Sequence, residues 1–246
     1  MGVRVAIPVL TRYRDLRLLT PRGVFEPRSD AGMLLDAAGD HVRGDVLDVC
    51  TGSGVIALSV APRSRRVTAV DSSLVAVAAV RLGALVNGAA VEVLHGDLFE
   101  PVAGREFDVI LANPPYVPTP VGVSARGSRA WDGGQDGRAV LDRLCREAAA
   151  HLRPGGDLFL VQSSLAGTDR TLAMLEQAGL SPSLAAARPG PLGPLARAQL
   201  GHLRAIGALG EDAVEEIVVV HAQREEPRRL MPRVGTVRAT ACPGRR

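Results

Sequence analysis

The residues best suited to chemistry lie at the ends of short apolar runs in the first half of this 246-residue chain. Asp48, Asp71 and Asp97 each lie at or just beyond the carboxyl end of such a run, and Asn113 follows a fourth run. If the runs are parallel strands, their carboxyl ends line one crevice, which is where ligands bind in open α/β sheets. Three carboxylates and a carboxamide there would accept hydrogen bonds from hydroxyl and amino groups.

The first apolar run leads into a glycine turn that spans residues 48–54 with the sequence Asp-Val-Cys-Thr-Gly-Ser-Gly. Glycines at this position let the backbone turn sharply and approach a ligand closely. The helix expected after the turn adds free N–H groups at its start. On its own, a Gly-x-Gly turn is equally compatible with a purely structural turn.

The charge of the crevice indicates the class of ligand. Asp71, 17 residues beyond Gly54, is placed to bind both hydroxyls of a ribose. A dinucleotide fits poorly, because no third glycine follows at the usual spacing and the crevice offers carboxylates rather than cations. S-adenosylmethionine fits better, since it has an ammonium, a sulfonium, a ribose and an adenine but no phosphate.

The most specific motif is Asn113-Pro114-Pro115-Tyr116, and Asn113 is one of only two asparagines in the chain. Proline fixes its own φ and restricts the residue before it, so this turn should hold Asn113 and the Pro114 carbonyl rigidly. Two fixed acceptors beside an aromatic ring can hold a planar –NH2 group by both hydrogens. The motif therefore predicts an amide or amine substrate; the alternative is a proline-rich loop with a structural asparagine.

A parallel sheet with flanking helices would bring these residues together. From about residue 44 to 222, apolar runs alternate with helical patterns, which predicts an α/β fold built from βαβ units. The predicted strands are 45–50, 66–70, 91–94, 107–112, 156–162, 183–187 and 216–222, and the predicted helices are 30–41, 54–61, 73–87, 135–152 and 168–178. Within the connection 188–210, one further helical face is expected from Leu195, Leu200, Leu203 and Ile206.

Composition excludes several classes of protein. All 29 basic residues are arginine, a bias typical of a GC-rich genome, so arginine, alanine and glycine are weak indicators of function here. No apolar run approaches the roughly 18 residues that span a bilayer, and Pro8, Arg12 and Asp15 interrupt the N-terminal stretch too early for a signal peptide. Three widely spaced cysteines form neither a disulfide framework nor a zinc pattern, so we expect no metal and a cytoplasmic protein.

The chain divides into three predicted segments. Residues 1–43 are an N-terminal extension with a helix that completes the cofactor pocket, residues 44–222 are the α/β domain, and residues 223–246 are a tail. The tail holds seven arginines and two glutamates, while the net charge of the whole chain is only +3. We therefore expect a disordered basic tail and no stable nucleic-acid binding, with weak contact to ribosomal RNA or an acidic partner as the alternative.

Over residues 20–222 the chain resembles the class I S-adenosylmethionine-dependent methyltransferases. Within that class it is most similar to the HemK-related enzymes that methylate glutamine in the Gly-Gly-Gln loop of translation release factors, in their archaeal and eukaryotic branch. Residues 23–30 resemble the V-Y-x-P-x-x-D segment of this branch, and residues 131–138 resemble its W-x-G-G-x-D-G-R loop. Residues 190–195 and 215–219 resemble its C-terminal end.

The resemblance implies a Rossmann-like, seven-stranded, mostly parallel sheet with helices on both faces, and S-adenosyl-L-methionine as cofactor. It also implies a release factor as protein substrate and, from the eukaryotic relatives, a small activator subunit as an optional partner. The cofactor-binding residues that it implies are Asp30, Asp48, Cys50, Gly52, Gly54, Asp71, Ser72, Asp97, Leu98 and Asn113. It implies Phe25, Pro27, Asn113, Pro115 and Tyr116 as substrate-binding residues, and Asn113, Pro114 and Tyr116 as the catalytic ones.

Two residues depart from the family pattern: Cys50 replaces the first glycine of the turn, and Ala31 replaces a frequent threonine. The chain has its own Gly-Gly-Gln triplet at 133–135, but the triplet falls inside the loop motif and Gln135 is predicted to begin a helix, so self-methylation is disfavoured. Three other functions remain as alternatives: a small-molecule N-methyltransferase, an adenine methyltransferase acting on nucleic acid, and a binding protein without catalysis.

Overall fold

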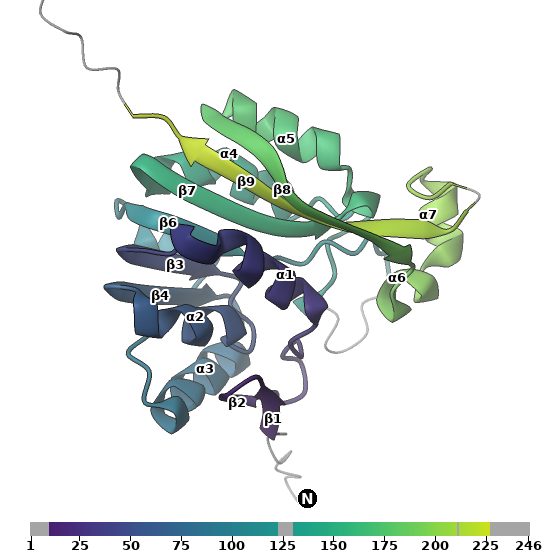
Figure 1. Cartoon of the computed structure of the whole chain (residues 1–246). Helices are drawn as coiled ribbons and strands as arrows, with labels where there is room; N and C mark the ends of the chain where they lie inside the picture. Colours follow the sequence, from purple (N-terminus) through teal and green to yellow (C-terminus); the bar gives the residue numbers. More distant parts are fainter. Residues whose placement is uncertain (1–9, 123–129, 211, 227–246) are drawn as a thin grey trace, which may run out of the picture.

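The computed structural model describes residues 10–122, 130–210 and 212–226, and over these residues it is an α/β protein around one twisted sheet (Figure 1). The order of the seven strands in this described part is β5-β4-β3-β6-β7-β9-β8. All neighbouring pairs are parallel except those of β9, which is antiparallel to both β7 and β8. The strands are β3 (Asp45–Val49), β4 (Arg66–Asp71), β5 (Glu92–His95), β6 (Phe107–Ala112), β7 (Leu152–Ser163), β8 (Leu180–Pro191) and β9 (Val214–Arg224).

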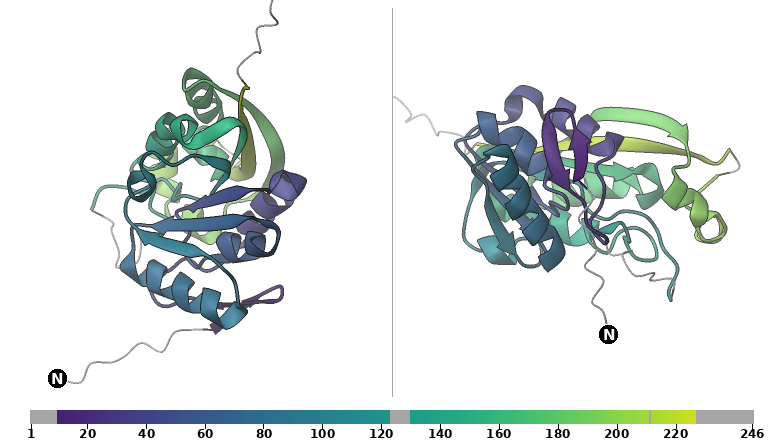
Figure 2. Two further views of the ribbon diagram at one scale, coloured as in Figure 1. Left: turned by 90° about the vertical axis from the view of Figure 1, so that its left-hand side faces the viewer. Right: turned by 90° about the horizontal axis from the view of Figure 1, so that it is seen from below.

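Helices cover both faces of the sheet (Figure 2). One face packs against α1 (Ser29–Ala38), α2 (Val55–Val60) and α3 (Leu74–Asn87), and the other against α4 (Leu141–Glu147) and α5 (Thr168–Gln177). Successive residues of the central strands belong to opposite cores, so these strands are apolar on both faces, as in other parallel sheets. Short 3-10 turns join the elements: η1 (Gly39–His41), η2 (Ala61–Arg63), η3 (Glu100–Val102), η5 (Ala148–His151) and η6 (Ser164–Ala166).

The predicted fold class is confirmed, and the strand predicted at 107–112 has the observed bounds of β6. The helix predicted at 135–152 is wrong at both ends. Residues 135–140 form turns, because Gly134 and Gly137 have positive φ values, and Leu152 already begins β7. Gln135 therefore does not begin a helix.

The connection 188–210 also differs from its prediction. Its first four residues continue β8, and the predicted helix is broken at Gln199 into α6 (Pro194–Ala198) and α7 (Leu200–Ala205). Leu203 is buried in a small cluster of its own with Leu165 and Leu192, whereas Ile206 lies beyond α7 and is exposed.

A hairpin in the N-terminal segment escaped prediction. The strands β1 (Leu10–Tyr13) and β2 (Leu16–Leu19) pair antiparallel, and β2 packs on α3. Asn87 at the end of α3 fixes the hairpin through two hydrogen bonds, here called the hairpin clip. Its amide donates to the Arg17 carbonyl at 2.8 Å and accepts from the Arg17 N–H at 3.0 Å. The predicted disorder of the tail concerns residues that lie almost entirely outside the described part. Among the described residues, no helix has the length and apolar character needed to cross a membrane.

Candidate active site

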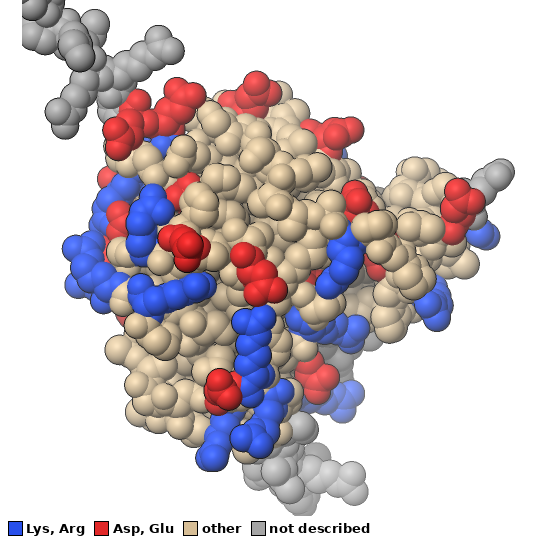
Figure 3. All heavy atoms as spheres, viewed as in Figure 1, with Lys and Arg blue, Asp and Glu red and all other residues tan. Residues whose placement is uncertain are grey.

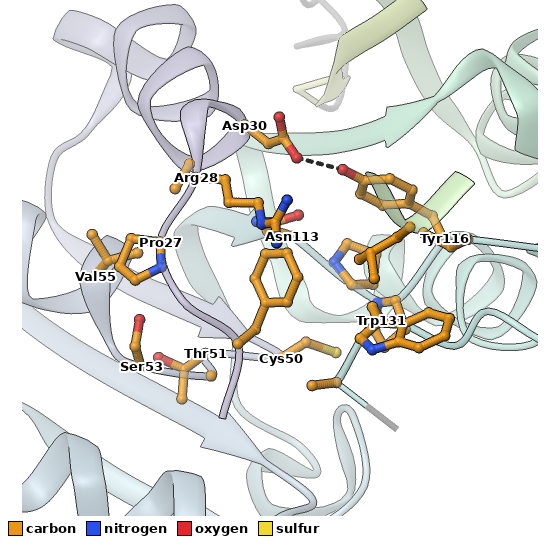
Figure 4. A pocket seen from close by; sticks show the side chains of 18 of the residues that line it. Pro27, Arg28, Asp30, Cys50, Thr51, Ser53, Val55, Asn113, Tyr116 and Trp131 are labelled. Atoms are coloured by element: carbon orange, nitrogen blue, oxygen red, sulfur yellow. Dashed lines mark hydrogen bonds between the residues drawn. The ribbon is translucent and has the colours of Figure 1, made fainter. Parts of the chain in front are cut away.

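A cleft of about 1160 Å³ opens where β3, β4, β5 and β6 end (Figure 4). Its further walls come from residues 23–31, from the loop that precedes α4 and from the end of β8 with the start of α6. Of the predicted site residues, those that line the cleft are Phe25, Pro27, Asp30, Cys50, Gly52, Asp71, Ser72, Asp97, Leu98, Asn113, Pro114, Pro115 and Tyr116. The other two, Asp48 and Gly54, do not line it and act from behind the glycine turn.

Asp48 is fully buried and braces the glycine turn from inside. Its Oδ2 accepts hydrogen bonds from the Thr51 hydroxyl at 2.6 Å and from the Ala57 N–H at 3.0 Å. Its Oδ1 has no hydrogen-bond partner within the described chain. Burial raises the pKa of Asp48 to about 7, although the bonds from Thr51 and Ala57 oppose the rise. The turn therefore encloses a carboxylate whose charge is not compensated, which suits a cationic ligand.

The glycine turn contains backbone positions with positive φ values, which favour glycine and are unfavourable for residues with a side chain. Gly54 has φ +78°, and a Cβ there would lie 2.9 Å from both γ carbons of Val80 on α3. Gly54 thus allows α2 and α3 to pack closely rather than contacting a ligand. Cys50, at the family's glycine position, has φ +60°, which is the left-handed region that L side chains disfavour. Burial raises the pKa of the Cys50 thiol, so the sulfur stays protonated and is no nucleophile.

Asp71 is held rigidly at the end of β4. Its Oδ2 accepts from the Gly52 N–H and its Oδ1 from the Ser73 N–H, both at 2.8 Å. Burial raises the pKa of Asp71, and the two backbone bonds partly offset the rise. The next strand end carries Asp97, which is paired with Arg143 at 2.8 Å near the rim, and buried Leu98 with φ +47°.

The opposite wall of the cleft contains the Asn-Pro-Pro-Tyr turn (Figure 4). Within the described residues, neither the Asn113 side chain nor the Pro114 carbonyl is engaged in a hydrogen bond. The Tyr116 hydroxyl, in contrast, donates to Asp30 Oδ2 at 2.6 Å. Burial raises the pKa of Tyr116 well above its usual range, and Asp30 adds to the rise, so the hydroxyl remains a donor.

The loop that resembles W-x-G-G-x-D-G-R supports this turn from behind. The Val117 N–H donates to the Trp131 carbonyl at 3.1 Å, and the Gly133 N–H donates to the Val117 carbonyl at 3.0 Å. A Cβ at Gly137 would lie 2.5 Å from the Tyr116 carbonyl oxygen, so the two segments are in close contact. Buried Arg138 anchors the loop through the carbonyls of residues 166 and 167 and the hydroxyl of residue 171.

The sequence-based prediction of the site missed many of the lining residues, among them Trp131, Arg28 and Arg188. Trp131 lines the cleft beside the turn, and as the single tryptophan within a family motif it could have been chosen (Figure 4). Arg28 lines it between two predicted residues. Arg188 and most of residues 189–196 enter from β8 and α6, and residues 190–195 belong to the stretch that resembles the C-terminal end of the family.

Comparisons with known proteins show the family to which the chain belongs. The methyltransferase small domain family matches residues 15–179. A Methanocaldococcus jannaschii protein that bears the name of a protein N5-glutamine methyltransferase is 35% identical over 181 residues, which cover 72% of this chain and 91% of that protein. The release factor glutamine methyltransferase of Gloeobacter violaceus is 36% identical over 178 residues, 66% of this chain and 62% of the relative.

Solved structures share the fold. The E. cuniculi Mtq2-Trm112 complex, described as responsible for methylation of the eRF1 termination factor, aligns with a TM-score of 0.59 at 23% identity and covers 82% of this chain and 99% of that one. The T. thermophilus 16S rRNA N2 G1207 methyltransferase, in complex with AdoMet and guanosine, also gives 0.59 at 22% identity and covers 89% and 50%.

Fold and cleft together define a class I methyltransferase. The chain belongs to the methyltransferase small domain family, as an S-adenosylmethionine-dependent enzyme whose relatives include glutamine methyltransferases. The predicted cofactor and family resemblance are therefore confirmed.

Proposed function

We propose that this enzyme methylates the side-chain amide nitrogen of glutamine in a Gly-Gly-Gln loop of a translation release factor, in the cytoplasm. The observation that carries the proposal is the pair of free acceptors, Asn113 Oδ1 and the Pro114 carbonyl, at the end of β6 beside Tyr116. A primary amide presents two N–H groups in one plane, which matches two fixed acceptors. The names of the archaeal and bacterial relatives support the same substrate.

The cleft residues fit the cofactor. When bound, S-adenosylmethionine supplies a methyl group on a positively charged sulfur. Asp71, fixed by two backbone N–H groups, would accept the ribose hydroxyls, and Asp97 with Leu98 would hold the adenine. Gly52 and the buried charge of Asp48 suit the cationic methionine end. The remaining residues proposed to bind the cofactor are Cys50, Gly54, Ser72 and Asn113, of which Gly54 acts through the packing of the turn. Asp30, which the resemblance also implies as a cofactor ligand, instead contacts Tyr116.

The wall of the cleft that contains Asn113, Pro114 and Tyr116, here called the acceptor wall because it would hold the methyl acceptor, can act without a catalytic base. An amide nitrogen is too weak an acid for a side chain to deprotonate it first, so alignment and charge stabilisation must supply the catalysis. The Asn113 and Pro114 oxygens would orient the nitrogen and stabilise the positive charge that develops on it. Phe25, Pro27, Pro115 and the Tyr116 ring would then enclose the amide from the sides.

The size and lining of the cleft favour a peptide over a small molecule. Ligand pockets usually measure roughly 300–1,000 Å³, so a cleft of about 1160 Å³ has room for the cofactor and an additional segment of polypeptide. The wall of the cleft formed by the end of β8 and the start of α6 contains Pro189, Gly190, Pro191, Gly193 and Pro194. Proline rings are rigid and glycine has no side chain, so a Gly-Gly loop could approach this part of the cleft closely.

The partner of the related Mtq2 structure suggests a small activator subunit for this chain as well. Helix α3 supports the suggestion, because its outer face is apolar: Leu74, Val75, Leu82, Leu85 and Val86 are all about half exposed or more. Several large apolar side chains exposed on one helix face are typical of a protein–protein contact, although Arg81 is also exposed on this face. We expect Leu82→Glu with Leu85→Glu to abolish binding and activation by a Trm112 protein while cofactor affinity is unchanged. Activation of the double variant to the wild-type level would argue against this surface.

The substrate proposal is tested with methyl-labelled S-adenosylmethionine, the release factor, and its variant in which the glutamine of the Gly-Gly-Gln loop is alanine. We expect label on the wild-type factor alone. Label on neither protein would overturn the proposal in favour of a small-molecule acceptor, and equal label on both would show that another residue is modified.

A further inference from the structure

Asp30 occupies a junction of three elements at the acceptor side of the cleft. It lies in the first turn of α1, and its Oδ2 accepts from the Tyr116 hydroxyl at 2.6 Å (Figure 4). Its Oδ1 accepts from Arg188 of β8 at 3.3 Å and from Ser29 at 3.3 Å, and Arg188 also donates to the Ser29 hydroxyl at 2.9 Å. Both oxygens of this largely buried carboxylate are therefore engaged, one of them by the tyrosine of the catalytic turn.

We propose that Asp30, backed by Arg188, is the positioning residue that fixes the Tyr116 ring beside Asn113, and that it serves the acceptor rather than the cofactor. The acceptor role of Tyr116 rests on the proposed function. The hydrogen bond itself and its consequence for cofactor binding do not, so the two can be tested apart.

The strength of the contact supports this role. A hydroxyl that donates to a carboxylate at 2.6 Å is in the range of charge-assisted hydrogen bonds, which are about twice as strong as neutral ones. Arg188 lies 3.3 Å from Asp30 Oδ1 and so places a positive charge beside this largely buried side chain. Burial keeps the proton on Tyr116, so the donor and acceptor roles do not exchange.

The direction of the contact also defines what Tyr116 can do. Its hydroxyl points toward Asp30 in the first turn of α1 and is occupied by that contact, and Tyr116 also lines the cleft (Figure 4). Without Asp30, a buried hydroxyl would lose its partner, and an unsatisfied buried donor is costly enough to turn the side chain toward water or toward Asn113. The ring would then no longer stand at a fixed place beside the amide.

The kinetic test compares Asp30→Ala, Asp30→Asn and Tyr116→Phe in the release-factor assay, with Asp36→Ala as control. Asp36 is an exposed carboxylate of the same helix, paired with Arg14. We expect Asp30→Ala to lower kcat roughly ten- to a hundredfold, the scale of a charged hydrogen bond. Asp30→Asn keeps an acceptor oxygen and should recover most of kcat, Arg188→Leu should lose severalfold, and Asp36→Ala should match the wild type.

The double variant Asp30→Ala with Tyr116→Phe separates positioning from an independent role. If Asp30 acts through the tyrosine, the double variant is no slower than Tyr116→Phe alone. Calorimetry should give the same dissociation constant for S-adenosylmethionine in Asp30→Ala and wild type, within about threefold. Additive losses in kcat, or a cofactor affinity at least tenfold weaker, would overturn the proposal and make Asp30 a cofactor ligand.

A spectroscopic experiment needs no methyl acceptor. It therefore tests the contact between Asp30 and Tyr116 even if the release factor is not methylated. The chain has only two tyrosines, and Tyr13→Phe leaves Tyr116 as the only one. In this background the ultraviolet titration reports ionisation of Tyr116 alone. Because Asp30 raises the pKa of Tyr116, Asp30→Ala should lower the midpoint, whereas Asp36→Ala should not move it. An unchanged midpoint in Asp30→Ala would overturn the proposed contact.

Discussion

The two ends of the sheet use the same residue types in opposite ways. At the amino ends of the strands, each acid is paired with arginine: Arg65 and Arg153 both bind Asp45, and Arg153 also binds Asp108 at 2.6 Å. Burial favours a raised pKa for Asp45, but the two arginines outweigh it and lower the pKa. In Figure 3 the left-hand edge, which overlies these strand ends, has arginines and acids side by side.

Other acids far from the cleft follow the same rule. Arg105 binds Glu92 at 2.8 Å, and this contact lowers the pKa of Glu92. Asp157, fully buried on β7, is satisfied by Arg43 at 3.2 Å and by His221 at 2.8 Å. These carboxylates are paired with basic side chains, so they contribute to the stability of the fold.

At the carboxyl ends, the acids are partnered by backbone N–H groups and hydroxyls instead. Asp48 and Asp71 have no arginine partner within the described chain, and burial raises the pKa of both. Asp97 is the exception, since Arg143 binds it near the rim, where both side chains are partly exposed. An uncompensated buried carboxylate is unfavourable by itself, so its presence indicates a cationic ligand, whereas paired carboxylates indicate structure.

The largest expected effect is on turnover and comes from Asn113, which lies at the carboxyl ends of the strands. Asn87, the other asparagine of the chain, lies at the far end of α3. Asn113→Ala should reduce turnover by roughly a hundredfold to a thousandfold, because one of two oxygens that stabilise the developing charge is lost, while cofactor affinity remains near the wild-type value. Asn87→Ala is the matched control at the far end of α3. It should leave turnover intact and lower the free energy of unfolding by about 1–2 kcal/mol, because the hairpin clip is lost.

Turnover is measured as methyl transfer under saturating cofactor. The free energy of unfolding is measured by urea denaturation. Unchanged turnover in Asn113→Ala would contradict the role of the turn, and equal loss of turnover in Asn87→Ala would show that the loss reflects destabilisation.

The next effect contrasts one acid from each end. Asp71→Asn should weaken S-adenosylmethionine binding by roughly tenfold or more, because a charged acceptor of the ribose hydroxyls is lost. Asp108→Asn should leave that affinity unchanged and lower the free energy of unfolding by about 1 kcal/mol, since it weakens the bond to Arg153. Calorimetry and urea unfolding of both variants provide the check. If the two variants lose affinity equally, the division between the ends does not hold.

Sequence reasoning found the central sheet because its signals are local. Apolar runs buried on both faces marked β3, β4 and β6, and the helix predicted at 73–87 is close to α3, whose N-cap bond from the Ala76 N–H to Ser73 is present. Strand ends then brought the acids and Asn113 to one edge by topology alone.

The parts that sequence could not supply depend on tertiary contacts. The β1–β2 hairpin is stabilised by Asn87, which is 70 residues away from Arg17, and nothing near the hairpin encodes that clip. The partner of Asp30 is Tyr116, 86 residues further along, so Asp30 could be placed at the cleft but not assigned to the acceptor wall. Arg188 lies beyond the predicted strand 183–187 and belongs to β8, which is longer than predicted at both ends.

A smaller effect is expected in the pH dependence of stability. Since the pKa of Asp48 is about 7 in the folded protein and 3.8 for the reference side chain, the folded state binds more protons between these values. The contribution of Asp48 to the free energy of unfolding should therefore decrease as pH rises from about 4 to about 7, and then stay level. Asp45, with its lowered pKa, contributes with the opposite sign and loses stability only in acid.

Urea unfolding of the wild type and of Asp48→Asn at several pH values between 5 and 8 isolates this term. As pH rises, the free energy of unfolding of the wild type should decrease relative to that of Asp48→Asn. A difference that does not change with pH would mean that Asp48 is ionised throughout and that the turn is not a site of uncompensated charge.

The smallest effect concerns backbone strain in the same turn. Cys50 has φ +60°, a conformation that is unfavourable by roughly 1–2 kcal/mol for a residue with a Cβ. Glycine relieves this strain but adds freedom to the unfolded chain, and the loss of the packed thiol opposes it further. We therefore expect Cys50→Gly to raise the free energy of unfolding by only about 0.5 kcal/mol, with cofactor affinity within about twofold of the wild type.

Cys145 provides the matched control, because it is buried in α4 with ordinary helical backbone. Cys145→Gly should lower the free energy of unfolding by about 1 kcal/mol or more, since it introduces glycine into a helix and removes a core side chain. If Cys50→Gly is destabilising to the same extent, then packing of the thiol outweighs strain, and the residue at the family's glycine position stabilises the turn through its side chain. A stabilised variant with weaker cofactor binding would instead show that the strained backbone is part of the binding site.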